Sequence, residues 1–479
     1  MATYSLIHLP KTFPVTAHTD FVGPDSTFVA IKGNQYDGVH FISQALERGA
    51  TTIVVADTVS LSSCITQKIA ASGARIMRVA DTRYALATLS AQAAGYPAKQ
   101  LTIIGITGTK GKTTTSFLLA HMFESAGVST ALLSTVGNRI GQHQFSTHLT
   151  TQQPDYLHQF FALCVQTNVS VVIMEVAAQA LSLHRTAGIE FDGALFTNFS
   201  QEHGEFYATQ QDYFNAKCLL FDQVKYAAPC IVNADDLVCN SLLEKKQHLG
   251  FSMHSASMPF YGEIQETTDY HARLLFKYQS KEQLLVCPAL VGTFNCYNIL
   301  AAASMASMFI DDSSVIQKAL TTFKPVPGRM EHYQLDNGAR CIIDYAHTPS
   351  SYQELFSLLA TWTDNLIVVF GAGGARDKEK RPVMGAIAAL FAHTILLTSD
   401  NPRNEDPHAI VDDILTGIPL EKRESVFVEL DREQAIKKAY ALSKSTSIIV
   451  LLGKGPDEYQ LIGSEKIYFS EKQIVALLQ

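Results

Sequence analysis

The stretch LTIIGITGTKGKTTTSFLLAHMFESAG, residues 101–127, decides the fold of the region around it. Its apolar start predicts a buried strand, and the pattern after the glycines predicts a helix that begins near Lys112. Between them lies a Gly-rich turn within residues 105–113. The backbone N–H groups of such a turn can point inward, the helix N-terminus adds partial positive charge, and Lys112 can reach phosphate oxygens. The stretch therefore predicts a phosphate-binding loop at the end of a strand.

The loop departs from the commonest phosphate-binding pattern, GxxxxGK[ST], because Ile106 stands where the first glycine belongs. A chance Gly-rich turn is the alternative, but the strand before, the helix after and the intact GKT favour phosphate. The Thr113 hydroxyl is placed to ligate Mg²⁺. Such a loop does not distinguish hydrolysis, phosphate transfer and ligation. The candidate nucleotide-binding residues in it are Gly108, Thr109, Lys110, Gly111, Lys112, Thr113 and Thr114.

Apolar strands alternate with helical patterns on both sides of this stretch. The segments TALLST, VVIMEV, GALFTNF and PCIVNAD predict a parallel sheet covered on both faces. The pattern turns polar and less regular near residue 254, and strand–helix repetition in the last third predicts a second open α/β sheet. Two prolines within residues 325–329 indicate a hinge. We expect an α/β protein with a small N-terminal α/β domain (1–95), a central domain (96–326) and a C-terminal domain (327–479).

Composition narrows the class of protein. A chain of 479 residues is too long for one ordinary core. Its 45 acidic and 37 basic residues give a net charge of −8, which argues against non-specific nucleic-acid binding. The eight cysteines show no zinc or disulfide spacing, so we expect buried free thiols in a reducing compartment. No signal peptide or membrane-length apolar run occurs, so we expect a cytoplasmic protein.

Several motifs, taken in order, resemble those of the Mur ligases, which build the peptide stem of the bacterial cell wall. TGTKGKTTT is similar to the family's TGTNGKTTT, and TNFSQEH, GTFNCYNILAA, VPGRME and DYAHTP follow in the family's order. The segments GAGGARDKEKRP, TSDNPR and GKGPDEYQ resemble the subfamily that adds the third residue of the stem. The resemblance covers nearly the whole chain. It implies a UDP-end-binding N-terminal domain, a central P-loop-type ATPase domain and a Rossmann-like C-terminal domain that binds the amino acid.

The resemblance also implies a mechanism in which ATP converts a peptide carboxylate to an acyl phosphate that an amine then attacks. Lys112 would stabilise charge on the γ-phosphate, and Glu175 and His203 match residues that hold a second Mg²⁺. Lys217 matches a lysine that reacts with CO₂ to form a carbamate. The implied catalytic residues are thus Lys112, Glu175, His203 and Lys217, and the implied metal ligands are Thr113, Glu175, His203 and carbamylated Lys217. Taken singly, each of Glu175, His203 and Lys217 could equally be a solvated polar residue.

Further residues match family positions around the other reactants. The resemblance places Asn295 and Asn298 at the adenine, although polar residues at a helix start are a plainer interpretation. It places Arg329, Asp344 and His347 near the nucleotide as well. The implied contacts to UDP-N-acetylmuramoyl-dipeptide are Thr19, Asn34, Gln35, Thr150, Thr151, Ala177 and Arg185.

The DNPR motif is the most informative about the amino acid that is added. In the family, an arginine here accompanies meso-diaminopimelate, whose distal carboxylate it can bind bidentately. Lysine lacks that carboxylate, so diaminopimelate is favoured over lysine. A surface turn would explain DNP but not the arginine. The implied amino-acid-binding residues are Arg376, Asp400, Asn401, Pro402, Arg403, Gly453 and Asp457.

Departures from the family pattern gather on the acceptor side. HTDF stands where the family usually has DSR, and Thr19 keeps only the hydroxyl of that serine. EVAAQ stands where the family has EVSSH, so Ala177 and Ala178 lack the two serine hydroxyls. Pro456 replaces a histidine in GKGPDE, and Ala375 replaces an aspartate. The open alternatives are a Mur-type ligase that adds lysine or uses another acceptor, a nucleotide-binding regulatory protein with weakened catalysis, and a simple nucleoside triphosphatase. A monomer is the default expectation.

Overall fold

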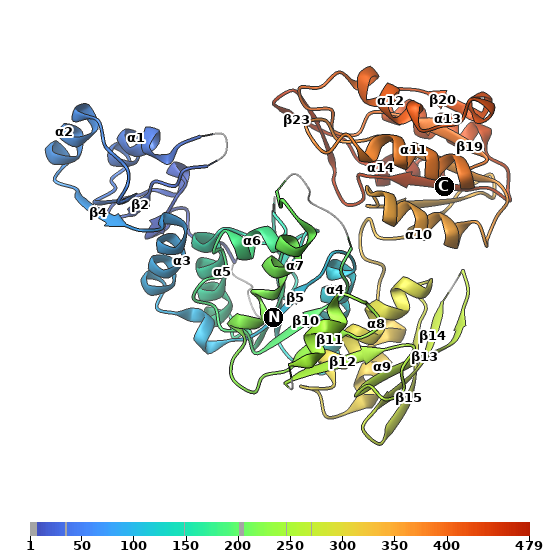
Figure 1. The fold of residues 1–479 in the computed structure, drawn as a ribbon, viewed down its shortest axis with the longest axis horizontal. Helices are drawn as coiled ribbons and strands as arrows, with labels where there is room; N and C mark the ends of the chain where they lie inside the picture. The colour runs from blue at the N-terminus through green and yellow to red at the C-terminus, as the bar shows by residue number, and fades with distance from the viewer. Residues whose placement is uncertain (1–6, 34–35, 148, 201–205, 246, 270) are drawn as a thin grey trace, which may run out of the picture. The chain divides into compact units, whose positions relative to one another are not determined.

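The computed structural model describes residues 7–33, 36–147, 149–200, 206–245, 247–269 and 271–479, in which helices and strands alternate (Figure 1). The chain divides into two compact units. The first contains the described residues up to 263, with 274–285 and 297–320, and the second contains 264–273, 286–296 and 321–479. Within these ranges, no helix is both long and apolar enough to cross a lipid bilayer. All eight cysteines are free thiols as predicted, but Cys64 is exposed and Cys218 only partly buried.

A small parallel sheet with strand order β1–β2–β3–β4 opens the first unit. Its strands are β1 (Val15–Thr16), β2 (Thr27–Val29), β3 (Thr52–Ala56) and β4 (Arg75–Val79). The helices beside it are η1 (Thr19–Phe21), η2 (Gly38–Phe41), α1 (Ile42–Glu47), α2 (Ser63–Ser72) and α3 (Thr82–Ala93), whereas η3 (Pro97–Gln100) packs against α5 and β5 of the large sheet. The Asp81 carboxylate caps α3 by accepting from the N–H groups of Arg83 and Tyr84. The helix then stops shortly before Gly95, as the GYP signal predicts.

A larger sheet of eleven strands lies mostly in the first unit, in the order β15–β14–β13–β12–β11–β10–β5–β9–β6–β7–β8. Neighbours from β6 to β13 pair in parallel, as the apolar runs predict, whereas β7 pairs antiparallel with both β6 and β8. The strands are β5 (Thr102–Thr107), β6 (Thr130–Leu133), β7 (Asn138–Ile140), β8 (His143–Phe145), β9 (Val171–Glu175), β10 (Gly193–Phe196), β11 (Cys230–Asn233), β12 (His248–Ser252), β13 (Phe260–Thr267), β14 (Ala272–Tyr278) and β15 (Lys281–Cys287).

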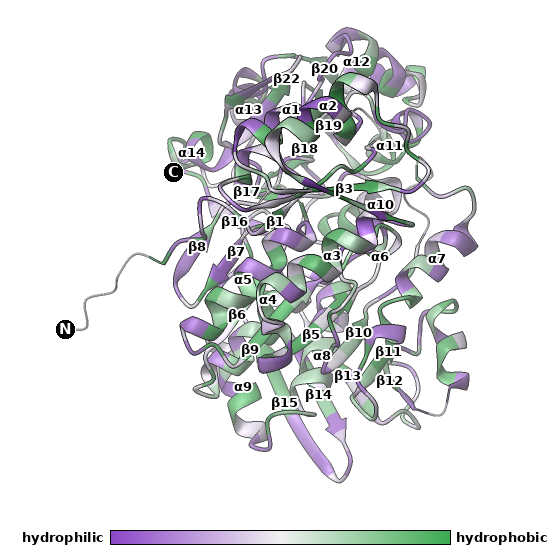
Figure 2. Ribbon diagram, turned by 90° about the vertical axis from the view of Figure 1, so that its left-hand side faces the viewer, coloured by the Kyte–Doolittle hydropathy of each residue, from purple (hydrophilic) through white to green (hydrophobic). Residues whose placement is uncertain are grey.

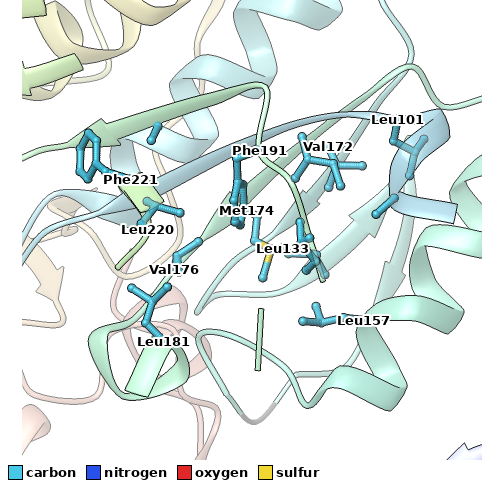
Figure 3. Close-up of a cluster of buried hydrophobic side chains, with 14 of the residues drawn as sticks. Leu101, Leu133, Leu157, Val172, Met174, Val176, Leu181, Phe191, Leu220 and Phe221 are labelled. Carbon is cyan, nitrogen blue, oxygen red and sulfur yellow. The ribbon is translucent and has the colours of Figure 1, made fainter. Parts of the chain in front are cut away.

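Helices supply the apolar side chains that cover this sheet. They are α4 (Lys112–Ser125), α5 (Pro154–Gln166), α6 (Ala178–Ser182), α7 (Gln210–Cys218), η4 (Phe221–Gln223), η5 (Cys239–Glu244), α8 (Thr293–Ala306) and α9 (Ser313–Thr322). Figure 3 shows one of the resulting cores. There Val172 and Met174 of β9 and Leu133 of β6 gather with Leu157 of α5 and Leu181 of α6. This packing fixes the strands whose carboxyl ends carry the candidate site.

The stretch after residue 254 is regular, contrary to the irregular segment that the sequence suggests. It forms β13, β14 and β15 at one end of the large sheet. Buried and partly exposed residues alternate along β14, so polar side chains interrupt the apolar pattern. Half-exposed strands of this kind lack the continuous apolar run that marks β5 or β9.

The second unit is built on a six-stranded sheet with order β16–β17–β21–β18–β19–β20, in which only the β16–β17 pair is antiparallel. The strands are β16 (Glu331–Gln334), β17 (Arg340–Asp344), β18 (Leu366–Phe370), β19 (Thr394–Leu397), β20 (Val426–Val428) and β21 (Ile448–Leu452), with a separate hairpin of β22 (Tyr459–Ile462) and β23 (Glu465–Tyr468). The helices are α10 (Pro349–Leu359), α11 (Lys380–Phe391), α12 (Pro407–Thr416), η6 (Leu420–Ser425), α13 (Arg432–Leu442) and α14 (Glu471–Ala476).

Both faces of the six-stranded sheet are covered, which confirms the predicted second α/β sheet. Alternate residues of one strand enter different cores: Ile342 of β17 lies in one, and Cys341 and Ile343 lie in the other. The covering helices are amphipathic, and Figure 2 shows polar and apolar residues interleaved along α12. On α12 the apolar residues Ile410 and Ile414 are buried.

A buried ion pair joins the last helix, α14, to the rest of the second unit. The Arg432 guanidinium on α13 lies 2.7 Å from Oε1 of Glu471 on α14, and the two side chains are 0% and 2% exposed. Arg432 also donates to the carbonyl oxygen of Leu452, at the end of β21, at 2.7 Å. Because β21 ends there, the pair ties α14 to the edge of the sheet that carries the functional loops.

We predict that Arg432→Met lowers the free energy of unfolding of the second unit by about 3–5 kcal/mol, because it leaves the Glu471 carboxylate buried without its cation. Adding Glu471→Leu should recover at least half of that loss. Urea unfolding followed by fluorescence measures the effect, since Trp362, the only tryptophan of the chain, packs against a core of this unit. The control is Lys437→Met, which removes an exposed helix pair with Glu433 and should cost less than about 0.5 kcal/mol. Equal losses of unfolding free energy in Arg432→Met and Lys437→Met would contradict the stabilising role of the buried Arg432–Glu471 pair.

Candidate active site

The phosphate loop, residues 108–111, leaves β5 and enters α4 in a conformation that needs glycine at two positions. Gly108 has a φ of 142° and Gly111 a φ of 79°. A Cβ at Gly108 would lie 2.0 Å from Oγ1 of Thr197, and a Cβ at Gly111 would lie 2.2 Å from Oδ1 of Asn298. Any side chain here would strain the backbone and displace its neighbours. The predicted strand–loop–helix unit is therefore present, with its glycines where close packing requires them.

Residues directly after β10 fix the loop through hydrogen bonds. The N–H of Thr109 donates to the Asn198 carbonyl at 2.8 Å, and the N–H of Lys110 donates to Asn198 Oδ1 at 2.9 Å. Thr197 Oγ1 donates to the carbonyl of Lys110 at 2.6 Å. These bonds form because β10 pairs in parallel with β5, so both strands end at the same edge of the sheet. These hydrogen bonds hold the loop in place.

Two lysines that are far apart in the sequence meet at the phosphate loop. The Lys112 ammonium donates to the carbonyl oxygens of Gly108 and Thr109, each at 2.8 Å. The Lys217 ammonium, on α7, donates to the same Gly108 oxygen at 2.7 Å and lies 4.3 Å from the ring centroid of Tyr213. The Lys217 side chain is buried. The structure thus brings together two of the predicted catalytic residues.

The predicted metal ligand Glu175, at the end of β9, is fully buried and lies beside the phosphate loop. Its Oε2 accepts from Thr113 Oγ1 at 3.1 Å and from Thr135 Oγ1 at 3.0 Å. Its Oε1 accepts from the N–H of Thr135 at 3.0 Å. Buried carboxylate and hydroxyl oxygens are the ligand types that Mg²⁺ prefers, so this donor set fits that ion. The sequence did not single out Thr135, which follows β6 without a distinctive motif.

The other two predicted metal ligands, His203 and Lys217, are not seen as ligands beside Glu175 and Thr113 among the described residues. His203 lies outside the described residues, as do Asn34 and Gln35 among the predicted substrate contacts. An ammonium cannot ligate a cation, so Lys217 would act as a metal ligand only as a carbamate. In the described ranges no group of three or more His, Cys, Asp and Glu side chains is arranged to hold a metal ion. A carbamate on Lys217 would supply a second acidic group at the phosphate loop.

Three predicted substrate residues form a chain of hydrogen bonds that leads from Glu175. Thr151 Oγ1 donates to the Glu175 carbonyl oxygen at 2.9 Å and accepts from the N–H of Ala177 at 3.0 Å. The Arg185 guanidinium donates to the Thr151 carbonyl oxygen at 2.9 Å, and burial lowers the Arg185 pKa. Thr150 joins the set because its hydroxyl lies at hydrogen-bond distance, 3.0 Å, from Thr135 Oγ1. The backbone between β9 and α6 is thereby tied to the metal-ligand candidate.

Thr19 and the two α8 asparagines lie apart from that chain. Thr19 begins η1 beside the small N-terminal sheet, and its carbonyl oxygen accepts from Arg48. Asn298 faces Gly111 at the start of α4, and its Oδ1 accepts from Thr115 Oγ1 at 3.4 Å. Asn295 donates to the Val291 carbonyl oxygen at 2.9 Å, which is a helix-start contact. Of the two predicted adenine contacts, Asn298 is therefore the one seen against the phosphate loop.

In the second unit, the segments around Arg329 and Asp344 meet the GKG loop. A Cβ at Gly328 would lie 2.2 Å from the carbonyl carbon of Gly455, so the two backbones touch. The Asp344 carboxylate accepts from the N–H groups of Met330 and Ala346, each at 2.8 Å, and burial raises its pKa although Arg329 opposes the shift. His347 follows in the loop after β17, and its side chain is exposed.

The DNPR turn is held by the β22–β23 hairpin, an element that the sequence did not predict. Arg403 has a φ of 53°, an uncommon conformation for a residue with a side chain. Its N–H donates to the Leu461 carbonyl at 3.0 Å, and its carbonyl accepts from the N–H of Gly463 at 2.8 Å. The guanidinium donates to the Gly374 carbonyl at 2.8 Å. The hairpin thus fixes the backbone while the GAGGARD loop orients the side chain.

A buried lysine connects the other predicted amino-acid-binding residues. The Lys454 ammonium lies 3.3 Å from Asp400 Oδ1 and donates to Asn401 Oδ1 at 3.1 Å. Gly453, with a φ of 101°, lies against the Asp400 carboxylate, and the half-buried Asp457 donates its N–H to the Lys454 carbonyl. Burial raises the pKa of Asp457, and Lys454 partly opposes this shift. Lys454 was not predicted, although its place in GKG after a buried strand is a usable signal.

Family models match three consecutive parts of the chain. The Mur ligase family catalytic domain matches residues 15–94, the Mur ligase middle domain matches residues 106–306, and the Mur ligase glutamate ligase domain matches residues 328–455. Together the three matches span most of the sequence and agree with the three-domain α/β architecture that the resemblance implied.

Curated relatives are similar over nearly their whole length. A UDP-N-acetylmuramoyl-L-alanyl-D-glutamate--2,6-diaminopimelate ligase of Aquifex aeolicus is 36% identical over 477 residues, which is 98% of this chain and 93% of that protein. A ligase of the same name from Syntrophomonas wolfei is 34% identical over 471 residues, covering 95% of this chain and 92% of that protein.

Solved structures of Mur ligases are also similar to this chain over nearly its whole length. A structure with the same ligase name superposes with a TM-score of 0.65 and 26% identity, covering 98% of this chain and 94% of that one. The fold is also that of a MurF ligase from Thermotoga maritima in complex with ADP, with a TM-score of 0.64, 18% identity and coverage of 92% and 94%. The phosphate loop, its metal-ligand candidate and these full-length similarities lead to one conclusion: the chain belongs to the Mur ligase family.

Proposed function

We propose that this ligase uses ATP to add meso-diaminopimelate to UDP-N-acetylmuramoyl-L-Ala-D-Glu during peptidoglycan precursor synthesis. The curated relatives that carry this activity in their names match the chain end to end. The observation that carries the choice of amino acid is the pair of Arg403 and Arg376, whose side chains both approach Gly373. A second carboxylate on the incoming amino acid is the natural partner of two neighbouring guanidinium groups.

ATP dependence follows from the family, and the phosphate loop explains it physically. The N–H groups at the N-terminus of α4 and the Lys112 ammonium would stabilise the negative charge that shifts onto the phosphates as the γ-phosphoryl group leaves. We propose that Asn298, Arg329 and Asp344 contact the same nucleotide. For Mg²⁺ we propose Thr113, Glu175 and His203 as ligands, and the ion would supply positive charge close to the transferred phosphate.

The remaining steps need a nucleophile and a leaving group held in line. The D-glutamyl carboxylate attacks the γ-phosphorus, ADP leaves, and an acyl phosphate forms. The amine of diaminopimelate then attacks the acyl carbon, and inorganic phosphate leaves. We propose that Thr150, Thr151 and Arg185 position the carboxylate, because their hydrogen bonds connect the backbone after β9 to Glu175. Asp400, Asn401 and Asp457 would receive the ammonium groups of the amino acid.

We further propose a monomer that works in the cytoplasm, where ATP and nucleotide-linked precursors occur, with domains at 1–95, 96–326 and 327–479. The three family matches fall inside these ranges. The proposed contacts Thr19, Asn34 and Gln35 belong to the first domain.

The function is tested by incubating the protein with ATP, UDP-N-acetylmuramoyl-L-Ala-D-Glu and a panel of amino acids, and by identifying the products by mass. We expect ADP, phosphate and the diaminopimelate-containing tripeptide in equal amounts. A product formed preferentially with lysine would contradict the choice of diaminopimelate but leave the ligase reaction supported. ATP turnover that does not respond to either substrate would contradict the ligase reaction itself.

Arg403→Ala should raise the KM for diaminopimelate by about 10- to 100-fold, because a hydrogen-bonded charge pair contributes roughly 1.5–3 kcal/mol. The KM for ATP should stay within about twofold, since the phosphates bind elsewhere. The control is Arg423→Ala, because Arg423 also donates to a backbone carbonyl in the second unit. Steady-state kinetics measures both constants, and an equal rise in the two KM values would overturn the role of Arg403.

Lys217→Ala should lower kcat by about 100-fold or more if Lys217 acts as a carbamate at the metal site. A short carboxylate such as acetate should then restore part of the activity, because it supplies the lost acidic group. Lys225→Ala, which removes a lysine paired with Asp192 in a partly exposed ion pair, should change little and gain nothing from acetate. The absence of rescue in the Lys217 variant, together with wild-type activity that does not depend on bicarbonate, would contradict carbamylation.

A further inference from the structure

An ion cluster that the proposed reaction does not use lies next to the arginine pair. The Arg381 side chain, on α11, is 0% exposed. Its guanidinium donates to both carboxylate oxygens of Glu405, at 2.8 and 2.9 Å, and to Asp413 Oδ2 at 2.8 Å. Lys378 adds a second cation to Glu405 at 2.7 Å. These bonds hold the pKa of the Glu405 carboxyl far below its usual range, with the Arg381 hydrogen bonds as the largest cause.

Glu405 is also in contact with the loop that carries Arg376. Its Oε2 accepts from the N–H of Ala375 at 3.1 Å, and a Cβ built on Gly374 would lie 3.1 Å from the Glu405 Cβ. Arg381 reaches the same loop through the Gly373 carbonyl oxygen at 3.2 Å. The carboxylate therefore lies among the residues that place the substrate-binding arginines.

The two substrate-binding arginines lie close to each other at the same loop. A Cβ on Gly373 would lie 3.2 Å from a terminal nitrogen of Arg403 and 3.5 Å from Cγ of Arg376. The pKa of Arg403 is lowered by burial and by the charge of Arg376. Glu405 follows Arg403 closely in the chain and bonds to the neighbour of Arg376. An anion in this position would be a competing partner for both guanidinium groups.

We propose that Arg381 is a positioning residue that sequesters the Glu405 carboxylate, so that Arg403 and Arg376 stay available for the distal carboxylate of the amino acid. This inference rests on the proposed function. The physical reason is that a partly desolvated carboxylate takes the nearest cation, and an intramolecular anion competes at a high effective concentration. With Arg381 in place, Glu405 has a better partner, because a forked guanidinium binds both of its oxygens.

A plainer role would be that of a structural tether, in which the Arg381–Glu405 pair only holds two loops together. The two roles predict opposite effects of removing the Glu405 charge from a protein that already lacks Arg381. If Arg381 sequesters a competitor, then removing the Glu405 charge should rescue the loss of Arg381. If the pair is only a tether, then removing both partners is at least as damaging as removing one.

The experiment measures kcat/KM for diaminopimelate and for lysine in five proteins: wild type, Arg381→Met, Glu405→Gln, the double variant and Asp413→Asn. We expect Arg381→Met to reduce the selectivity for diaminopimelate over lysine by about tenfold, because Glu405, left with the exposed Lys378, then also pairs with the arginines. The double variant should regain at least about threefold of that loss. Glu405→Gln alone, and Asp413→Asn on the other side of the guanidinium, should each stay within about threefold of wild type.

A double variant that is no more selective than Arg381→Met would overturn sequestration in favour of the tether. Trp362 fluorescence during urea unfolding checks that each protein is folded. If Arg381→Met does not fold, Arg381→Lys replaces it, alone and with Glu405→Gln, and the sign of the second substitution decides the question in the same way. Failure of the proposed function is recognised separately, because wild type would then not prefer diaminopimelate over lysine at all.

Discussion

The carbonyl oxygen of Gly108 accepts hydrogen bonds from two ammonium groups, those of Lys112 and Lys217, and the first unit is organised around that point. One lysine begins α4 and the other lies near the end of α7, so the contact joins two helices to the end of β5. It is possible only because Gly108 packs against Thr197 with no side chain in between. Parallel pairing of β5 with β9 and β10 then places Glu175 and Asn198 at the same edge. Catalytic geometry is in this sense a result of strand register.

In the second unit, buried ion pairs hold the loops at the carboxyl ends of the strands. Lys454, Arg381 and Arg432 are each withdrawn from solvent and each bind a carboxylate that lies on, or next to, a loop at the carboxyl ends of the strands. Such pairs contribute little net stability when compared with apolar side chains, but they are costly to break singly. They therefore define loop positions more than they strengthen the fold. Arg403 and Arg376, the proposed amino-acid-binding arginines, lie on loops that the Arg381 and Lys454 pairs hold.

The sequence predicted most of the parallel strands, because continuous apolar runs such as those of β5 and β9 have few other interpretations. It did not predict β13–β15, whose half-exposed residues interrupt that pattern, or the β22–β23 hairpin that fixes Arg403. The phosphate loop was readable from its residues, whereas Lys217 was recognisable only through family resemblance. Pairs such as Arg381 with Glu405 leave no periodic signal, since partners are brought together by the sheet and not by spacing along the chain.

The backbone of Arg403 has a consequence for how selectivity can change. In the left-handed region a non-glycine residue costs about 1–3 kcal/mol, and asparagine tolerates that region better than arginine does. A substitution to asparagine would therefore relax the turn while it discards the carboxylate partner. Folding and substrate choice thus favour different residues at this position. A need for the proposed carboxylate contact, and not the stability of the turn, would explain why arginine stands at this position.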